Sequence, residues 1–330
     1  MKVAVVGATG LVGSTLVRLL DENEILSRNL TLVASARSAG TIFSASGESR
    51  PVLDIGSRWH VNQDLVFLMA GRNISRREIP QLRDKVPLII DNSSAFRMEP
   101  DVPLVVPQVN PEAARQHSGL IANPNCSTIQ LVVAVNPIHK LSPVTRIHVS
   151  TYQAASGAGK EFMERFWKEA REDVKLEPRE ISGRSETLSF NLLPVIDTIL
   201  EDGYTREEEK IMEETRKILS DESIHVSATA IRVPVVNAHS ESVYLETVDG
   251  LDIECVKSAL SQAPGVRFVE DYNNPPTPRQ VSGSGDVFVS RLRKDRDREN
   301  AIHMWVVADN LRKGAALNAL EIAKLFMQEC

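Results

Sequence analysis

The first 125 or so residues alternate short, uninterrupted apolar runs with segments of helical periodicity. The apolar runs lie at residues 3–6, 30–34, 65–69 and 88–90, and a helical pattern over about 11–20 follows the first of them. A strand that is apolar at every position has no solvent-facing side, so these runs predict a parallel sheet covered by helices on both faces. The first half of the chain is therefore expected to be a doubly wound α/β domain of the Rossmann type.

The second half has a different pattern. Strand candidates lie at residues 225–233, 286–292 and 302–307, and helical spacing covers 160–174, 205–219 and 311–327. Alternating polar and apolar positions predict a largely antiparallel sheet with one face in solvent. Thr205 and Glu208 have the spacing of a helix capping box. We expect the domain change near residues 123–130, where Asn-Pro-Asn-Cys interrupts the alternation.

Composition narrows the class of protein. A chain of 330 residues suits two domains of ordinary size, and its net charge of -6 gives no basic footprint for nucleic acid. No apolar run reaches the ~18 residues of a membrane helix. The three cysteines, Cys126, Cys255 and Cys330, are widely spaced without a CxxC pair, which predicts neither a metal site nor a disulfide framework. We expect a soluble protein of a reducing compartment, by default the cytoplasm.

A glycine motif follows the first predicted strand. Residues 7–13 read G-x-x-G-x-x-G and open the first predicted helix. Glycines permit the tight turn, and the N-terminus of the helix receives a dinucleotide pyrophosphate. After the second apolar run, Ser35-Ala36-Arg37-Ser38 stands where an NAD site usually has an acid. Arginine with hydroxyl neighbours suits a 2′-phosphate, so the sequence favours NADP, with an ordinary surface arginine as the alternative.

Cys126 lies in the turn Asn-Pro-Asn-Cys-Ser-Thr, just before a buried helical run at 129–134. At the N-terminus of a helix the dipole favours a thiolate, which indicates a nucleophile rather than the commoner buried core cysteine. Neither Cys255 nor Cys330 has this setting. A thiolate needs a proton partner, and His239, in a predicted loop between strand candidates, is the best placed of seven histidines. A structural role stays open for any single histidine.

Four charged residues are candidates for binding a charged substrate. Arg97 follows the predicted strand at 88–90, at the edge where open α/β sheets bind ligands, and Arg232 ends a long strand. Glu207 and Lys210 share one helix face, either as a solvated ion pair or as part of a site. Two arginines and a lysine around a thiolate would suit an acidic or phosphorylated substrate.

Eight segments, in order along essentially the whole chain, resemble the aspartate-semialdehyde dehydrogenase family. They are GATGLVG (7–13), SARSAG (35–40), DNSSAFR (91–97), VPLVVPQVN (102–110), NPNCST (123–128), STYQAASGAG (150–159), AIRVPVVNAHSE (230–241) and DNLRKGA (309–315).

The resemblance implies a role for each matching residue. Cys126 matches the nucleophile, His239 the acid–base residue and Gln153 a glutamine beside the substrate. Arg232 matches the residue that holds the substrate carboxylate, and Glu207 the residue that contacts its amino group. Arg97 and Lys210 match the phosphate-binding pair. The residues that match cofactor contacts are Gly7, Thr9, Gly10, Leu11, Val12, Ser35, Arg37, Ser38, Ser156, Gly157 and Asn310.

The resemblance also implies the architecture and the reaction. It implies an NADP-binding domain over 1–126, to which a helix at 309–330 returns. The second domain, over 127–308, would be a mixed α/β domain of the glyceraldehyde-phosphate-dehydrogenase-like kind that serves catalysis and homodimer formation. The implied reaction is NADP-dependent reductive dephosphorylation of aspartyl phosphate to aspartate semialdehyde through a cysteine thioester, without a metal or a membrane. It belongs to the aspartate pathway to lysine and diaminopimelate, threonine, methionine and isoleucine.

Two alternative functions stay open, and one segment departs from the family pattern. An enzyme resembling N-acetyl-glutamyl-phosphate reductase would share the thiol chemistry, but its acetylated substrate has no charged amine for Glu207. A non-catalytic NADP-binding sensor would not need the set of Cys126, Gln153, Arg232 and His239. Gly71-Arg72-Asn73 departs from the family's small Gly/Ser-rich run in a loop that resembles a cofactor contact.

Overall fold

The computed structural model describes residues 1–22, 29–45 and 48–328. Two compact units divide the chain: Met1–Asn125 with Gly314–Cys330, and Cys126–Lys313. The sequence predicted borders at 126/127 and 308/309. Residues 329 and 330, which end the predicted 309–330 segment and include Cys330, lie outside the described residues.

The first unit contains a seven-stranded sheet in the order β3-β4-β2-β1-β5-β6-β7. Neighbouring strands are parallel except for β3 and β4, which pair antiparallel. The strands are β1 (Val3–Val6), β2 (Leu30–Ala34), β3 (Ile42–Ala45), β4 (Glu48–Asp54), β5 (Leu65–Leu68), β6 (Leu88–Asp91) and β7 (Leu120–Ala122). The helices are α1 (Leu11–Glu22), α2 (Arg72–Leu82) and α9 (Leu317–Gln328).

The parallel sheet predicted for the first half of the chain is confirmed. Strands β1, β5 and β6 are buried at every position, as strands covered on both faces must be. The chain leaves β1 toward β2 but leaves β5 toward β6, in the opposite direction. Because such crossovers are right-handed, α1 and α2 lie on opposite faces of the sheet. Strands β3, β4 and β7 were not predicted, since β4 is largely exposed and β7 has only three residues.

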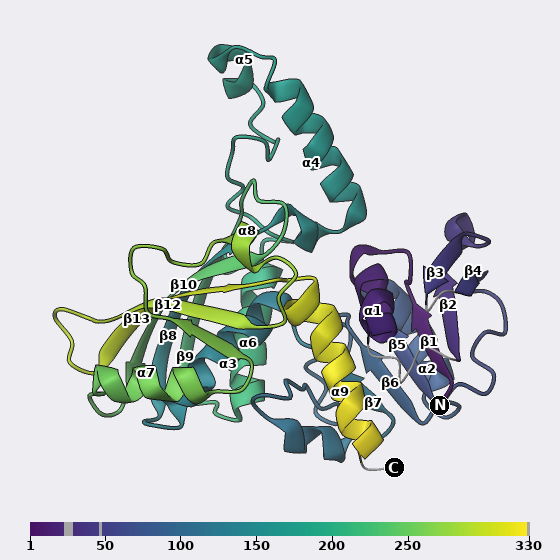
Figure 1. Cartoon of the computed structure of the whole chain (residues 1–330), viewed down its shortest axis with the longest axis horizontal. Coiled ribbons are helices and arrows are strands. Elements are labelled where there is room, and N and C mark those ends of the chain that lie inside the picture. The colour runs from purple at the N-terminus through teal and green to yellow at the C-terminus, as the bar shows by residue number, and fades with distance from the viewer. Residues whose placement is uncertain (23–28, 46–47, 329–330) are drawn as a thin grey trace. The chain divides into compact units, whose positions relative to one another are not determined.

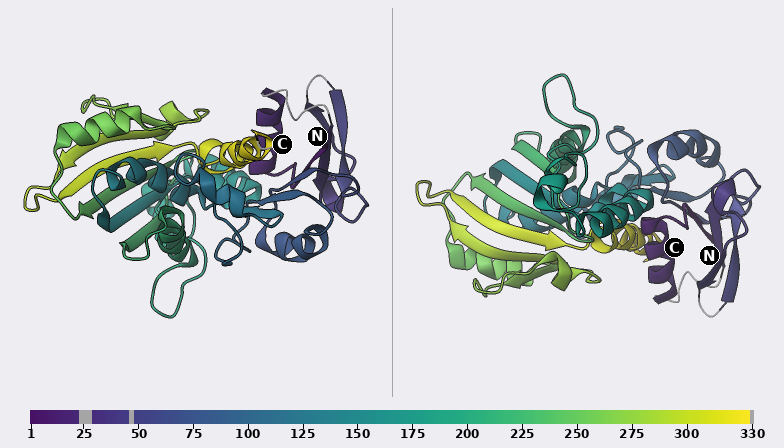
Figure 2. Two further views of the ribbon diagram at one scale, coloured as in Figure 1. Left: turned by 90° about the horizontal axis from the view of Figure 1, so that it is seen from below. Right: turned by 90° about the horizontal axis from the view of Figure 1, so that it is seen from above.

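The second unit contains a six-stranded sheet in the order β11-β12-β13-β10-β8-β9. The strands are β8 (Val144–Gln153), β9 (His225–Arg232), β10 (His239–Thr247), β11 (Val266–Val269), β12 (Val287–Lys294) and β13 (Ala301–Ala308). The helices are α3 (Cys126–His139), α4 (Lys160–Asp173), α5 (Pro178–Ser182), α6 (Arg206–Leu219), α7 (Ile253–Gln262) and α8 (Pro278–Val281). Figures 1 and 2 show the yellow-green to yellow strands β12 and β13 side by side in this sheet.

The second sheet is largely antiparallel, as predicted, but each of its two edge strands pairs parallel to its neighbour. Three central pairs are antiparallel, but β9 pairs parallel to β8, and β11 pairs parallel to β12. Strand β9 runs parallel to β8 because the long connection through α6 returns the chain to the same end of the sheet before β9 begins. On one face of the sheet α3 packs against β8, β10, β12 and β13, with α6 and α7 beside it.

The opposite face of this sheet carries polar and aromatic side chains. Along β10, Val243 and Leu245 are buried, whereas Ser242 is exposed and Tyr244 is half-buried. This is the alternation expected of a sheet whose two faces are unequally covered. On this face the short helix α8 packs against β13, where Val281 meets Val307 and Trp305. Helices α4 and α5 extend away from the sheet of the same unit (Figure 1). No helix formed by the described residues is long and apolar enough to cross a bilayer.

Candidate active site

Cys126 is the first residue of helix α3, as the turn before it predicted. The helix has 14 residues, has no acidic side chain in its first turn and is buried over most of its length. Its N-terminal dipole therefore acts on the half-buried Cys126 without a competing carboxylate, which favours the thiolate form.

His239 is the first residue of strand β10, so its predicted position in a loop is wrong. The loop ends at Ala238, whose left-handed backbone (φ 72) turns the chain into the strand. The imidazole is fully buried, and its Nδ1 accepts a hydrogen bond from the Ala154 amide at 3.0 Å. Burial, and then the charge of Arg232, lower the pKa of His239 well below its ordinary value. At neutral pH the ring is therefore uncharged.

Arg232 ends strand β9 and is anchored inside the second unit. Its Nη1 donates to the Ala154 carbonyl at 2.9 Å and lies 3.4 Å from Gln153 Oε1. Burial lowers the pKa of Arg232, and the negative charges of Glu207 and Cys126 oppose that effect. The attraction between the guanidinium and the Cys126 sulfur is mutual, so Arg232 stabilises a thiolate there.

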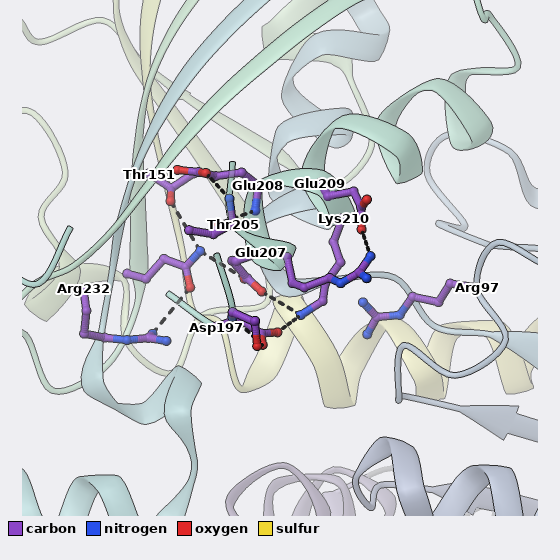
Figure 3. Close-up of polar contacts among 12 residues, drawn as sticks. Arg97, Thr151, Asp197, Thr205, Glu207, Glu208, Glu209, Lys210 and Arg232 are labelled. Carbon is purple, nitrogen blue, oxygen red and sulfur yellow. Dashed lines mark hydrogen bonds and ion pairs between the residues drawn. The ribbon is translucent and has the colours of Figure 1, made fainter. Parts of the chain in front are cut away.

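A chain of polar contacts runs from Gln153 into helix α6, and Figure 3 labels its members Glu207, Lys210 and Asp197. Gln153 Nε2 donates to Glu207 Oε1 at 3.1 Å. Lys210 Nζ lies 3.1 Å from Glu207 Oε2 and 2.8 Å from Asp197 Oδ2. Burial lowers the pKa of Lys210, but these two carboxylates raise it above its ordinary value. The Glu207–Lys210 pair is thus part of a network that is buried at Glu207, half-buried at Lys210 and exposed at Asp197, and not an isolated surface ion pair.

The predicted capping box positions that network and is confirmed. The Thr205 side chain accepts from the Glu208 amide at 3.3 Å, and Glu208 Oε2 accepts from the Thr205 amide at 2.7 Å. Glu208 Oε1 also accepts from the Ala230 amide at 2.9 Å, which ties the start of α6 to β9. These contacts fix the turn that carries Glu207 and Lys210 beside the strand that carries Arg232.

Gly157 leaves space for two of these side chains. A Cβ atom built there would lie 2.8 Å from Arg232 Nη1 and 2.9 Å from both Cε1 and Nε2 of His239. Ser156 is tied to Asn310, whose Nδ2 donates to Ser156 Oγ at 3.0 Å and whose Oδ1 accepts from the Ala238 amide at 2.9 Å. The second unit therefore groups Cys126 with the other predicted residues of the same unit, which are Gln153, Ser156, Gly157, Glu207, Lys210, Arg232, His239 and Asn310.

In the first unit, the glycine loop has the geometry that a pyrophosphate requires. Gly7 has a left-handed backbone (φ 85), and a Cβ atom there would lie 2.5 Å from the Met69 carbonyl oxygen. A Cβ atom at Gly13 would lie 2.1 Å from the Gly7 carbonyl oxygen. No acidic residue occupies the first turn of α1, where Leu11 and Val12 begin the helix after Thr9 and Gly10. The loop therefore fits a dinucleotide.

The predicted NADP-selecting residues follow strand β2. Arg37 and Ser38 lie in a short 3-10 turn, Ala36–Ser38, that begins after Ser35. A pocket of about 550 Å³ opens beside Ser35 and Ala36 and continues between residues 54–60 and α2. Arg72, the bulky departure from the family pattern, is the exposed first residue of α2.

Arg97 is buried in the first unit, beyond the end of β6. Its Nη2 donates to the Asn92 carbonyl at 2.8 Å. The nearby Asp91 is fully buried and accepts from the hydroxyls of Ser75 and Ser93 at 2.7 and 2.9 Å. Burial raises the pKa of Asp91 despite these hydrogen bonds and the charge of Arg97. The loop that presents Arg97 is thus anchored by a buried carboxyl group.

Sequence reasoning missed Asp197 and Ala154. Asp197 lies 13 residues before its partner Lys210, in a left-handed backbone conformation (φ 69) that no local pattern announces. Ala154 contributes only its peptide group, which no residue-type pattern can reveal. Among the described residues, no group of three or more His, Cys, Asp or Glu side chains is arranged to hold a metal ion.

Glu241 is a buried acid on β10, two residues after His239. Neither carboxyl oxygen has a hydrogen bond of good geometry among the described residues, and the facing polar group is Gln130 of α3. Burial raises the pKa of Glu241 well above its ordinary value, and the Gln130 amide offsets only part of that effect. The buried site therefore favours the protonated form of the Glu241 carboxyl group.

This raised pKa predicts a pH-dependent stability. The fold favours the protonated form of Glu241, so its stabilising contribution to the free energy of unfolding is complete below the pKa of about 4.3 that it has in the unfolded state. That contribution is lost as pH rises toward its pKa in the folded state. The wild type should lose about 1 kcal/mol of unfolding free energy per pH unit in that window. Denaturant titrations from pH 5 to 8 should show a smaller loss for Glu241→Gln. The exposed Glu186→Gln should follow the wild type, and equal slopes for all three would contradict the assignment.

Comparisons with known proteins agree with this arrangement. Residues 2–117 match the family model described as semialdehyde dehydrogenase, NAD binding domain, and residues 135–313 match semialdehyde dehydrogenase, dimerisation domain. Aspartate-semialdehyde dehydrogenases from Synechocystis sp. and Aquifex aeolicus are 43% and 45% identical to this chain, covering 99% of it and 98% of each relative.

A solved structure is similar to this chain over nearly its whole length. The crystal structure of aspartate semialdehyde dehydrogenase II from Vibrio cholerae, complexed with ASA, superposes with a TM-score of 0.94. It is 39% identical and covers 99% of this chain and 98% of its own. The predicted two-domain α/β architecture, with a dinucleotide-binding domain and a dimerisation domain, is thus confirmed. This chain belongs to the aspartate-semialdehyde dehydrogenase family of oxidoreductases.

Proposed function

We propose that this protein interconverts aspartate semialdehyde plus phosphate and aspartyl phosphate, with NADP as the hydride carrier and Cys126 as the nucleophile. The observation that carries the proposal is the buried cluster of Arg232, Gln153 and Glu207 beside the N-terminus of α3. A buried cation and a buried anion, separated by one amide, complement a small substrate with one carboxylate and one ammonium group. An acetylated amine has no charge to pair with Glu207, which disfavours an N-acetylated substrate.

Each residue of the cluster then has a task. The Cys126 thiolate attacks the aldehyde carbon, and the later thioester is opened by phosphate. Arg232 binds the substrate carboxylate and Glu207 its amino group, while Gln153 holds the acyl part of the substrate between them. Lys210 and Arg97 bind phosphate. Lys210 is paired with Asp197 and Glu207, and its ammonium group has a third N–H that can donate to phosphate.

For the dinucleotide, we assign the pyrophosphate to the loop of Gly7, Thr9 and Gly10 with the start of α1, and the adenine to the pocket beside Ser35. Arg37 and Ser38 would bind the 2′-phosphate, and Ser156, Gly157 and Asn310 would contact the nicotinamide end. The dinucleotide, when bound, supplies the hydride acceptor for the oxidation and the hydride donor for the reverse reaction.

The NADP assignment predicts that Arg37→Ala weakens NADP binding about tenfold to a hundredfold, since a charge-assisted hydrogen bond contributes roughly 1.5–3 kcal/mol. Binding of NAD, which has no 2′-phosphate, should change less than threefold. Calorimetric titration with both dinucleotides measures this without turnover. Arg76→Ala, at an exposed position of α2, is the matched control. Equal losses for NADP and NAD would contradict a 2′-phosphate role.

A homodimer is part of the proposal, because the face opposite α3 in the second unit's sheet leaves aromatic side chains half-buried, although the short helix α8 packs against β13 there. That face carries Tyr152 packed against Trp305 and Tyr244 packed against His303, with ring centroids 5.7 and 5.1 Å apart. We propose that a second copy covers it. Light scattering at micromolar concentration should give twice the chain mass of 36.5 kDa, and Trp305→Asp should shift the protein toward the chain mass. A single-chain mass for the wild type would exclude the dimer.

The reaction itself is tested by the absorbance of NADPH formed from aspartate semialdehyde and NADP, with and without phosphate. Phosphate-dependent formation of NADPH supports both the hydride and the acyl-transfer parts of the proposal. No formation by folded protein that still binds NADP, combined with activity on N-acetyl-glutamyl semialdehyde, would overturn it. Binding of NADP without turnover of either substrate would also overturn it.

A further inference from the structure

The pocket of about 550 Å³ in the first unit has one side of α2 as a wall. The residues of α2 that line it are spaced at i, i+3, i+4, i+7 and i+8, which puts them on one face of the helix. They are Ile74, Arg77, Glu78, Gln81 and Leu82. A second wall is formed by residues 54–60, which follow strand β4. Because β4 pairs parallel to β2, with Asp54 beside Ala34, this wall begins next to Ser35 at the edge where both strands end.

The end of the pocket near Ser35 suits the flat ring of a base. Ala36, Ile55 and Ile74 line it with apolar side chains, and both isoleucines are half-buried. A ligand pocket commonly combines apolar walls with a few polar groups that fix the orientation of the ligand. Here one of these polar groups is the carboxylate of Asp54, which is half-buried at the same end.

The Asp54 carboxylate is held in place and still has an oxygen available to a ligand. Its Oδ1 accepts from the Gly56 amide at 2.8 Å, and the Asp54 carbonyl oxygen accepts from the Ser57 hydroxyl at 2.6 Å. Glu78, the other acid that lines the pocket, lies 2.7 Å from Arg77. Asp54 has no such ion pair within the described part of the chain, so its Oδ2 keeps its lone pairs for a ligand.

A carboxylate can only accept hydrogen bonds, and this property selects one group of an adenine. The ring nitrogens of an adenine joined to a ribose are acceptors, whereas its 6-amino group is a donor. The negative charge of Asp54 also repels phosphate, which favours the 2′-phosphate on the side of Arg37 and the base on the side of Asp54. Since adjacent strands lie about 4.8 Å apart, a base on a ribose at the end of β2 reaches the end of β4.

We propose that Asp54 recognises the 6-amino group of the dinucleotide's adenine and makes the protein select this base over one with an oxygen at the same position. The inference rests on the proposed function, because the ligand is the dinucleotide of that reaction. It gives the first unit a base-selecting residue in addition to Arg37 and Ser38, which are assigned to the 2′-phosphate.

Calorimetric titration with NADP and with nicotinamide hypoxanthine dinucleotide phosphate tests this contact without turnover. Hypoxanthine has a carbonyl oxygen in place of the amino group, so two acceptors would face each other at Asp54. The Gly56 amide holds the carboxylate against turning toward the N1–H that hypoxanthine also carries. We expect the wild type to bind the hypoxanthine compound about tenfold more weakly, at the low end for a hydrogen bond to a charged group because Asp54 is only half-buried. Equal affinities would overturn the inference.

Two substitutions separate the contact from the fold. Asp54→Asn keeps an oxygen for the Gly56 amide and turns an N–H toward the base, which matches a carbonyl but not an amine. The hypoxanthine-to-NADP ratio of dissociation constants should therefore fall from about ten to about one or below. Asp54→Ala should give a ratio of about one. Asp84→Asn, at an exposed position of the same unit that does not line the pocket, is the matched control and should keep the wild-type ratio. A ratio near ten in both Asp54 variants, with both folded by thermal unfolding, would overturn the inference.

Steady-state kinetics gives a second readout. The adenine is remote from the nicotinamide that carries the hydride, so its contact with Asp54 contributes equally to the bound ground state and the transition state. We expect Asp54→Asn to raise the KM for NADP about tenfold and to keep kcat within about twofold of the wild type. A kcat lowered tenfold or more at unchanged KM would indicate a structural role for Asp54 and contradict base selection.

The outcomes for the base and for the reaction can be told apart. A tenfold preference for NADP in calorimetry that is lost in both Asp54 variants would support the Asp54 assignment even if no substrate were turned over. Turnover of aspartate semialdehyde with the same KM for NADP and for the hypoxanthine compound would support the proposed reaction and overturn the Asp54 assignment. Absence of binding by both dinucleotides would overturn the two together.

Discussion

Replacing Cys126 with serine is expected to abolish turnover, lowering kcat by about a thousandfold or more while the protein stays folded. The N-terminus of α3 and the nearby charge of Arg232 can stabilise a thiolate, but an alcohol is far too weak an acid to ionise under the same influence. The measurement is steady-state formation of NADPH, together with NADP binding to show that the variant is intact.

Cys255→Ser is the matched control, because Cys255 is exposed on α7 and belongs to the same unit. It should retain the wild-type rate within twofold. Iodoacetamide should inactivate the wild type and the Cys255→Ser protein alike, and NADP with substrate should protect both. A Cys126→Ser protein that keeps a tenth of the wild-type kcat would exclude covalent catalysis at this residue.

Gly157→Ala is expected to lower kcat/KM by about a hundredfold, comparable to the effect of a 1 Å misplacement of catalytic groups. The added methyl group would lie 2.8 Å from Arg232 Nη1 and 2.9 Å from two atoms of the His239 ring. Neither side chain can move freely, since each is hydrogen-bonded to the Ala154 peptide. The backbone of Gly157 is not left-handed, so the effect comes from the collision and not from backbone strain.

Gly183→Ala provides the comparison within the same unit. Gly183 has an ordinary right-handed backbone (φ -75), and a Cβ atom there would meet only the Glu180 carbonyl oxygen at 3.4 Å. That variant should keep full activity. Thermal unfolding of Gly157→Ala should stay within a few degrees of the wild type, since Gly157 itself is exposed. Wild-type kcat/KM in Gly157→Ala would show that Arg232 and His239 do not need their present positions.

Much of the fold and several site residues could be predicted because their determinants are local. Strands β1 and β2 are found where the uninterrupted apolar runs are, and the cap of Thr205 and Glu208 begins α6 as its spacing predicted. The helix that begins at Cys126 follows from the turn residues before it and the apolar run after it. In each case the residues that decide the structure are within one or two turns of each other.

The sequence by itself determined four strands of the first sheet, three of the second, the glycine loop and the placement of Cys126 at a helix N-terminus. Through eight ordered segments it also indicated the family. Only the tertiary structure decided the hydrogen-bond partners and the pKa shifts of the side chains around the Cys126 sulfur. The Ala154 amide meets His239 across 85 residues of sequence, and Gln153 meets Glu207 across 54. Such partners are set by the pairing of β8 with β9 and β10. The hydrogen bonds of a buried histidine and the pKa shift of a buried acid depend on which groups that pairing brings close to them, and no local pattern contains this information.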